Sequence, residues 1–390
     1  MTPTVALIGA NGHGRWHRRQ IDALQGDGLL RLVALADVRP IEPDPPVPDG
    51  VAVFTDHREL LAATRPDVVV ICTPPHTHLA IALDALDTGC DLLLEKPPVL
   101  TAAEHATLLA AVRGAGRSCQ VHFQALGSAA LGMLTDALTG PAIGPVHSIA
   151  TVASWQRDDG YYQRAPWAGR RAVDGRAVLD GALVNPFAHA VMQCLAVAAA
   201  TGAGAPVRLE AERYRTRPIE VDDTAFARVT FRSGLRMMAA ATLAGEDFIP
   251  GEVIVAGATG RAVLEYPTDR LALPGDPALR EVPGRVGLLA NLLAHRDDPD
   301  GVPLLAPLDR TAGFTAVAEA LSAPGTPLPT LLGGPLVTAH GEGSGRVTVI
   351  REINAVLRYA ADSMELPSES GVGWAVPPVT HELVHEPAQG

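Results

Sequence analysis

The sequence predicts an α/β protein of two domains: an N-terminal doubly wound parallel sheet, then an α+β domain with a large, mostly antiparallel open sheet. The chain has 390 residues, which is long for a single hydrophobic core. Short apolar runs alternate with helical segments over the first 122 residues, as in parallel sheets with crossover helices. From Val146 onward the expected strands are longer and alternate in polarity, which is typical of antiparallel sheets with one open face.

Five short strands are expected in the first domain, at residues 5–8, 32–36, 68–72, 91–94 and 118–122. Helical segments separate them. Thr101 and Glu104 form a capping-box pattern that predicts a helix running to Ala115. Ligands of such sheets bind at the carboxyl ends of the strands, so the functional residues of this domain are expected there.

Longer strands are expected in the second half, at residues 146–155, 207–217, 224–231 and 235–242, with a hairpin at 251–264 that turns at 257–260. The predicted domains are therefore 1–123 and 124–362, followed by a Pro-rich tail, 363–390, ordered only where Trp374 docks. An open sheet face in the second domain favours a homodimer or homotetramer formed through that sheet.

Composition excludes several classes of protein. Apolar residues make up 47% of the chain, and the net charge of −12 includes no basic block, which argues against nucleic-acid and membrane-surface partners. The four cysteines lack disulfide density and CxxC spacing, so we expect free thiols and no metal. Neither a signal peptide nor a membrane span is predicted, and a cytoplasmic location is expected.

A glycine-rich loop, residues 9–14 with the sequence GANGHG, joins the first expected strand to the first helix. Glycines there let the backbone approach a pyrophosphate at the helix N-terminus, although Asn11 replaces the second glycine of the usual fingerprint. Asp37 ends the second strand, where a carboxylate binds the ribose hydroxyls of NAD. NAD is therefore expected over NADP, while Arg39 keeps NADP open as an alternative.

Two further motifs, Thr73-Pro-Pro-His-Thr-His78 and Glu95-Lys96-Pro97, are more specific. Together with the preceding strands they resemble the Gfo/Idh/MocA family, in which a Rossmann domain precedes an antiparallel α/β domain. The resemblance implies an NAD(P)-dependent enzyme acting on sugars or polyols. It places these residues on the dinucleotide and its nicotinamide: Gly9, Asn11, Gly12, His13, Asp37, Thr73, Pro74, His76, His78, Glu95 and Lys96. Lys96, beneath the reacting carbon, is the expected proton-handling group.

The family often carries an aspartate four residues before a histidine in its second domain. Here Asn185 and His189 occupy those places. Asn185 is expected to cap a helix that starts at Pro186, with His189 in its first turn, held neutral and able to accept a proton. The alternative is a structural cap and a core histidine.

An aromatic–basic segment, residues 155–171, lies just upstream in a chain that is only 4% aromatic. Aromatic faces suit sugar rings, and arginines suit carboxylates or phosphates. The expected substrate contacts are Arg157, Tyr161, Tyr162, Arg164, Trp167, Asn185 and His189. The alternative is a packing loop or a subunit contact.

Three functions are compatible with these residues. The first is an oxidoreductase that transfers a hydride between nicotinamide and a carbinol or ketone carbon of a sugar- or polyol-like substrate. The second is an NAD-using lyase, hydrolase or epimerase with transient oxidation and no net redox change, which the loss of the aspartate at 185 keeps open. The third is a non-catalytic dinucleotide-binding sensor or scaffold.

Overall fold

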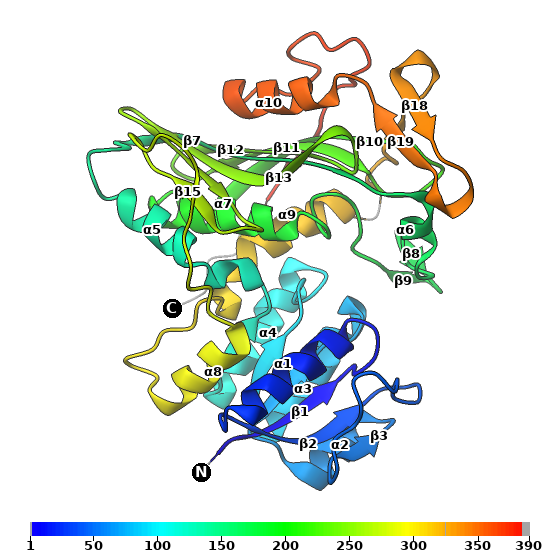
Figure 1. Ribbon diagram of the computed structural model, residues 1–390, viewed down its shortest axis with the longest axis vertical. Helices are drawn as coiled ribbons and strands as arrows, with labels where there is room; N and C mark the ends of the chain where they lie inside the picture. Colours follow the sequence, from blue (N-terminus) through cyan, green and yellow to red (C-terminus); the bar gives the residue numbers. More distant parts are fainter. Residues whose placement is uncertain (1, 324, 384–390) are drawn as a thin grey trace. The chain divides into compact units, whose positions relative to one another are not determined.

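The computed structural model describes residues 2–323 and 325–383, and these form two compact units. The first unit comprises residues up to 127 together with 286–315, and the second comprises 128–285 and the residues from 316 onward. The sequence analysis assigned 286–315 to the second domain, but this segment returns to the first. Each unit is described by itself below (Figure 1).

The first unit contains a six-stranded parallel sheet in the order β3-β2-β1-β4-β5-β6. Its strands are β1 (Thr4–Ile8), β2 (Arg31–Ala36), β3 (Ala52–Phe54), β4 (Val68–Ile71), β5 (Asp91–Leu94) and β6 (Cys119–Val121). Its helices are α1 (Gly14–Gly26), α2 (His57–Thr64), α3 (His78–Asp87), α4 (Ala102–Ala115) and α8 (Leu288–Asp297), with short turns η1 (Pro75–Thr77), η2 (Gln124–Gly127) and η3 (Leu308–Thr311). The predicted doubly wound parallel sheet is confirmed.

Local signals set these elements. All four residues of β4 and of β5 are buried, as expected of strands covered on both faces. The predicted capping box of α4 is present, since Thr101 accepts from the Glu104 amide and Glu104 reaches back to the cap. At the start of α2, the Asp56 side chain is the N-cap and accepts from the Arg58 and Glu59 amides.

Buried polar contacts tie segment 286–315 to the first sheet. Gln120 in β6 is fully buried, and its side chain donates to the Leu288 carbonyl and accepts from the Ala306 amide at 2.6 and 3.0 Å. Arg296 of α8 forms ion pairs with Asp67 and Asp91. Because a buried amide without partners is costly, these bonds fix the return of the chain to this unit.

The second unit contains a ten-stranded mixed sheet in the order β16-β15-β14-β13-β7-β12-β11-β10-β17, with β20 also paired to β10. Its strands are β7 (Val146–Gln156), β10 (Pro206–Arg215), β11 (Thr224–Phe231), β12 (Arg236–Thr242), β13 (Ala244–Gly257), β14 (Arg261–Glu265), β15 (Arg270–Ala272), β16 (Arg280–Glu281), β17 (Thr330–Leu331) and β20 (Val379–Glu382). Two hairpins lie outside it: β8 (Ala172–Val173) with β9 (Arg176–Ala177), and β18 (Val337–His340) with β19 (Val347–Ile350). Most pairs are antiparallel, and β7–β12 and β10–β17 are parallel.

The helices of this unit are α5 (Ala129–Ala137), α6 (Asp159–Gln163), α7 (Ala188–Ala200) and α10 (Ile353–Ser363), with turns η4 (Gly334–Leu336) and η5 (Gly343–Gly345). Helix α9 (Ala312–Ser322) carries the chain from the first unit into the second. The predicted hairpin is confirmed: β13 and β14 pair from Glu252 to Ala256, and the Gly257 amide bonds to the Gly260 carbonyl.

Both faces of the large sheet are covered. Helix α10 lies over one face and α7 over the other (Figure 1). The α10 face buries Ile353 and Leu357 against Val152, Phe226 and Met238 of the strands. The chain's own helices therefore pack on both faces, and the oligomer expected through this sheet stays a prediction.

Residues 366–383 of the predicted C-terminal tail pack against the second unit. Trp374 packs edge-on against Tyr214 with ring centroids 4.9 Å apart, which confirms its predicted docking. The Ser368 hydroxyl donates to Glu212 at 2.6 Å, and the Val376 amide donates to the Tyr214 hydroxyl. Within the described part of the chain, none of the helices has both the length and the apolar character that a membrane span needs.

Candidate functional site

The glycine-rich loop follows β1 and leads into α1. A Cβ atom on Gly9 would lie 2.3 Å from the Cys72 carbonyl oxygen, and one on Gly14 would lie 1.9 Å from that of Gly9. Gly9 and Gly12 have φ values of +89° and +56°, which favour glycine. The first turn of α1 carries no acidic side chain. The loop therefore leaves close backbone access at a helix N-terminus, the geometry that suits a pyrophosphate.

Asp37 lies at the carboxyl end of β2, beside this loop. Its two carboxylate oxygens accept from the Asn11 and Arg39 amides, each at 3.0 Å. The Arg39 side chain is largely exposed, and its Nε lies 3.9 Å from the carboxylate. The Asn11 side chain is buried and bonds to the Pro40 carbonyl and the Glu42 amide, so it holds the following loop in place.

The segment after β4 carries the predicted nicotinamide-side residues. His78 is fully buried and bonds to the Thr73 carbonyl through Nε2 and to the Pro97 and Pro98 carbonyls through Nδ1. Burial lowers the pKa of His78. This ring thus ties Thr73, Pro74 and His76 to the segment that contains Lys96.

Glu95 lies at the carboxyl end of β5 in the centre of a histidine–glutamate cluster, formed with His13, His17 and His122. His17 Nε2 and His122 Nδ1 each lie 2.8 Å from Glu95 Oε1, and His13 Nε2 lies 3.3 Å from it. The other oxygen, Oε2, accepts from the Lys96 amide at 2.9 Å. The cluster brings together α1, β5, the residue after β6 and the glycine-rich loop.

Burial and the neighbouring imidazoles shift the pKa of Glu95 in opposite directions. Burial alone would raise the pKa of Glu95, but His122 and the histidine hydrogen bonds outweigh it and hold that pKa well below its usual range. Burial lowers the pKa of His17, against the opposing influence of Glu95. Glu95 is therefore an anion and His17 a predominantly neutral imidazole near neutral pH.

In the second unit, the start of α7 differs from the prediction. The helix begins at Ala188 with Phe187 at the cap position, so Asn185 is not its N-cap. The Asn185 amide instead donates to the buried Asp180 carboxylate at 3.0 Å, whose other oxygen accepts from the Gly169 amide at 2.9 Å. Asp180 therefore competes successfully for the side chain that would have capped the helix.

His189 is the second residue of α7, in its first turn as predicted. Its ring lies 6.3 Å from that of Tyr266, centroid to centroid. Lys96 belongs to the first unit and His189 to the second.

The aromatic–basic segment forms a chain of stacked side chains. Arg164 lies over the rings of Tyr161 and Trp167, at 3.6 and 4.5 Å from their centroids. Arg157 lies over Tyr161 and over Trp155, and Trp155 packs on Phe187 just before α7. These distances are typical of cation–π contacts, so four of the predicted substrate residues, Arg157, Tyr161, Arg164 and Trp167, form one structural group.

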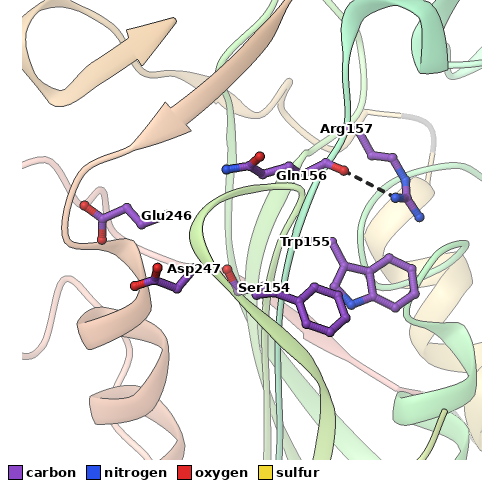
Figure 2. Close-up of a pocket in the computed structure, with 7 residues that line it drawn as sticks. Ser154, Trp155, Gln156, Arg157, Glu246 and Asp247 are labelled. Carbon is purple, nitrogen blue, oxygen red and sulfur yellow. Dashed lines mark hydrogen bonds between the residues drawn. The ribbon is translucent and has the colours of Figure 1, made fainter. Parts of the chain in front are cut away.

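A cavity of about 610 Å³ in the second unit lies beside these stacked side chains, and Trp155 and Arg157 belong to both. Figure 2 shows its lining, which consists of Ser154, Trp155, Gln156, Arg157, Glu246, Asp247 and Phe248. Phe248 is 73% exposed, and its ring is nearly parallel to that of Trp155, 6.5 Å away. Aromatic faces beside an arginine and two carboxylates can contact a polyhydroxylated ring.

The sequence predictions did not include Glu246, Asp247 and Phe248 of the cavity, nor His17, His122 and Asp180. His17 follows His13 at helical i,i+4 spacing, a signal that was available in the sequence. His122 directly follows β6, at a strand end. Asp180 had no local signal, because its importance depends on contacts with Asn185 and Gly169.

Comparisons with known proteins show which family the first unit resembles. Residues 4–123 match the model of an oxidoreductase family described as having an NAD-binding Rossmann fold. Over these residues the chain matches the NAD-binding Rossmann domain of the Gfo/Idh/MocA oxidoreductases. The chain is 28% identical over 98 residues to D-glucoside 3-dehydrogenase of Escherichia coli and 31% identical over 122 residues to inositol 2-dehydrogenase 1 of Saccharopolyspora erythraea. These matches cover 25% and 30% of this chain and only 28% and 35% of the relatives, about a third of their length.

Solved structures extend the likeness to the fold of both units. The WlbA dehydrogenase of Bordetella pertussis, solved with NADH and UDP-GlcNAcA, has a TM-score of 0.69 at 20% identity, over 85% of this chain and all of its own. UDP-N-acetylglucosamine 3-dehydrogenase of Acidithiobacillus ferrooxidans has a TM-score of 0.64 at 18% identity, over 83% of this chain and 97% of its own. The predicted fold class, a Rossmann sheet followed by an α+β unit with a large, mostly antiparallel sheet, is confirmed.

Proposed function

We propose that this protein is an NAD-dependent dehydrogenase or reductase acting on a carbinol or ketone carbon of a sugar- or polyol-like substrate. The observation that carries the proposal is the position and rarity of Lys96. It follows Glu95 at the carboxyl end of β5, the sheet edge that also holds the glycine-rich loop and Asp37. It is also the only lysine in a chain with thirty arginines.

A lysine retained among arginines fits a role in proton transfer. Arginine keeps its charge at all relevant pH values, whereas an ammonium group can give up a proton. Bound NAD would supply or accept the hydride. Lys96 would hold the substrate oxygen and exchange its proton, the acid–base role that such reactions need.

Support for NAD comes from the first unit. Gly9 and Gly14 let the loop pack tightly against the Cys72 and Gly9 carbonyls, whereas a Cβ on Gly12 would meet no atom within 4 Å. Asp37 accepts from the Asn11 amide of this loop. A carboxylate there binds ribose hydroxyls and repels the additional phosphate of NADP. Asp37→Ala should therefore weaken NAD binding and reduce the difference between the affinities for NAD and NADP. If the wild type binds NADP more tightly than NAD, Arg39 and not Asp37 determines the cofactor preference.

Support for a sugar-like substrate comes from the second unit. The cavity beside Trp155 and Phe248 presents aromatic faces next to Arg157, Glu246 and Asp247. The buried Tyr162 hydroxyl has no hydrogen-bond partner among the described residues, a cost that sites completed by a ligand commonly carry. The names of the relatives, which refer to a glucoside, inositol and UDP-sugars, point to the same class.

The function is tested by a substrate screen. The purified protein with NAD or NADH is incubated with sugars, polyols and nucleotide sugars, and absorbance is followed at 340 nm while products are identified by mass spectrometry. Net formation or loss of NADH with an oxidised or reduced product supports the proposal. NAD binding without conversion of any compound counts against it.

A second candidate is a lyase, hydrolase or epimerase that oxidises its substrate only transiently. The specific observation in its favour is Asn185, an amide where the resemblance expects a carboxylate, hydrogen-bonded to Asp180. Substrate conversion with tightly held NAD and no net change at 340 nm would favour this candidate.

A further inference from the structure

The histidine–glutamate cluster has more donors than a single carboxylate oxygen can use. Three ring nitrogens lie within 3.3 Å of Glu95 Oε1. A carboxylate oxygen offers about two lone-pair directions, so three N–H donors crowd it. Neutral imidazoles aimed at one point with their lone pairs, however, are the donors that a transition-metal ion uses.

The spacing along the chain points the same way. His13 immediately precedes α1 and His17 lies in its first turn, so the two rings are separated by i,i+4 on one side of the helix start. Pairs of histidines at this spacing bind zinc in helical metalloprotease motifs. One ring nitrogen each of His13 and His17 and one Glu95 oxygen lie within 4.8 Å of one another. Ligand atoms about 2.0–2.1 Å from a tetrahedral Zn²⁺ are roughly 3.4 Å apart. The 3.3 Å between His13 Nε2 and Glu95 Oε1 matches this spacing, and the 2.8 Å between His17 Nε2 and Glu95 Oε1 would lengthen when an ion binds.

The burial of the cluster also suits a metal site. His17 is 1% exposed and Glu95 is 7% exposed, so their ligand atoms are shielded from water. The His13 side chain is 62% exposed, which gives an ion an entry path.

We propose that His13, His17 and Glu95 bind a divalent transition-metal ion, with Zn²⁺ as the best match to two imidazoles and one carboxylate. His122 orients the carboxylate from outside the ligand set, as second-shell partners of metal sites do. Solvent or a bound anion would complete the coordination on the exposed side of His13.

One consequence rests on the proposed function. His13 belongs to the loop assigned to the dinucleotide, so Zn²⁺ and NAD should each weaken the binding of the other. Such coupling is reciprocal, because the free energy of binding both ligands does not depend on their order. The metal would then inhibit the enzyme by occupying Glu95 and His13.

The test uses full-length protein freed of metal and nucleotide. Titration with Co²⁺ is followed by visible absorption, and titration with Zn²⁺ by calorimetry. We expect one equivalent bound, with the intense visible bands of four- or five-coordinate Co²⁺. His13→Ala and His17→Ala should each weaken binding at least about 100-fold, and His122→Ala about 10- to 100-fold. His57→Ala is the matched control, since His57 pairs with Asp84 elsewhere in the same unit, and it should leave binding unchanged.

Absence of Co²⁺ bands, or equal affinity in wild type and His13→Ala, would overturn the proposal and leave the cluster as a hydrogen-bond network. His13 is exposed, so this variant is informative even if His17→Ala does not fold. Zn²⁺ binding is measured without NAD, so a protein that binds Zn²⁺ but not NAD would contradict the proposed function alone. Equal NAD affinity with and without Zn²⁺ would contradict only the coupling.

Discussion

At the scale of single residues, Lys96 is the side chain on which the proposed chemistry depends. Lys96→Ala should lower kcat by about 10²-fold or more, the usual cost of losing an acid–base group, while leaving NAD affinity nearly unchanged. Lys96→Arg is the sharper comparison, because it keeps the charge but cannot exchange a proton. It should be nearly as slow as Lys96→Ala. Near-full turnover by Lys96→Arg would mean that Lys96 acts only as a charge.

Asp180 and Asn185 offer a test of the prediction that His189 exchanges a proton and that a carboxylate in this segment acts on it. Asp180 is buried and hydrogen-bonded to Asn185, four residues before His189. A nearby carboxylate raises a histidine pKa, so Asp180→Asn should move the acid limb of the pH–rate profile to lower pH, and Asn185→Asp should move it to higher pH. The double variant should lie close to wild type. Identical profiles for all four proteins would show that His189 is not the titrating group.

The pH dependence of stability can be followed at Asp222, which is buried, accepts from the Ala182 amide and lies 3.9 Å from Arg213. Burial raises the pKa of Asp222 to about 6. The folded state therefore binds this proton more tightly than the unfolded chain, and the contribution of Asp222 to stability falls as pH rises from about 4 to 6.

Denaturant unfolding of wild type and Asp222→Asn across this range measures that contribution. The free energy of unfolding of the wild type, relative to the variant, should decrease by up to about 3 kcal/mol between pH 4 and 6. A difference that stays constant with pH would show that the carboxyl group is not buried as described.

At the scale of elements, helix α10 covers one face of the large sheet. Leu357 is fully buried against this face, whereas Tyr359 on the same helix is 51% exposed. Leu357→Ala should lower the free energy of unfolding by about 2–5 kcal/mol, because it leaves a cavity in a packed core. Tyr359→Ala is the control and should cost much less, as exposed substitutions usually do. Equal effects of the two changes would contradict the packing of α10.

The elements that the sequence predicted well have local causes. The strands of the first unit are continuous apolar runs, and Thr101 with Glu104 forms a capping box from residues three apart. The motifs at residues 9–14, 73–78 and 95–97 were recognisable because their members are neighbours in sequence.

The rest could not be predicted because it depends on distant contacts. The start of α7 shifted because Asp180, not the helix, binds Asn185. The return of segment 286–315 depends on Gln120, and the order of the C-terminal segment depends on Tyr214 and Glu212. The histidine–glutamate cluster joins residues as far apart as His13 and His122, so no single motif contained it.

At the scale of the whole molecule, the chain combines an NAD-binding Rossmann unit with a second unit whose sheet is covered on both faces. Helix α10 and residues of segment 366–376 pack on one face of this sheet, and the homodimer or homotetramer through the sheet stays a prediction. In the proposed function, the aromatic–basic segment, the cavity and His189 of the second unit contact the substrate. We therefore propose that the first unit binds the cofactor and supplies Lys96, and that the second unit recognises the substrate.

The central claim is that a hydride moves between substrate carbon and nicotinamide. It is tested most directly with the active compound from the substrate screen, labelled with deuterium at its carbinol carbon and converted in the presence of NAD. The account predicts that the NADH isolated from the reaction carries one deuterium at C4 of the nicotinamide and that the product is the ketone. Deuterium found in water, with unlabelled nicotinamide, would show that the carbon loses a proton instead of a hydride and would contradict the account.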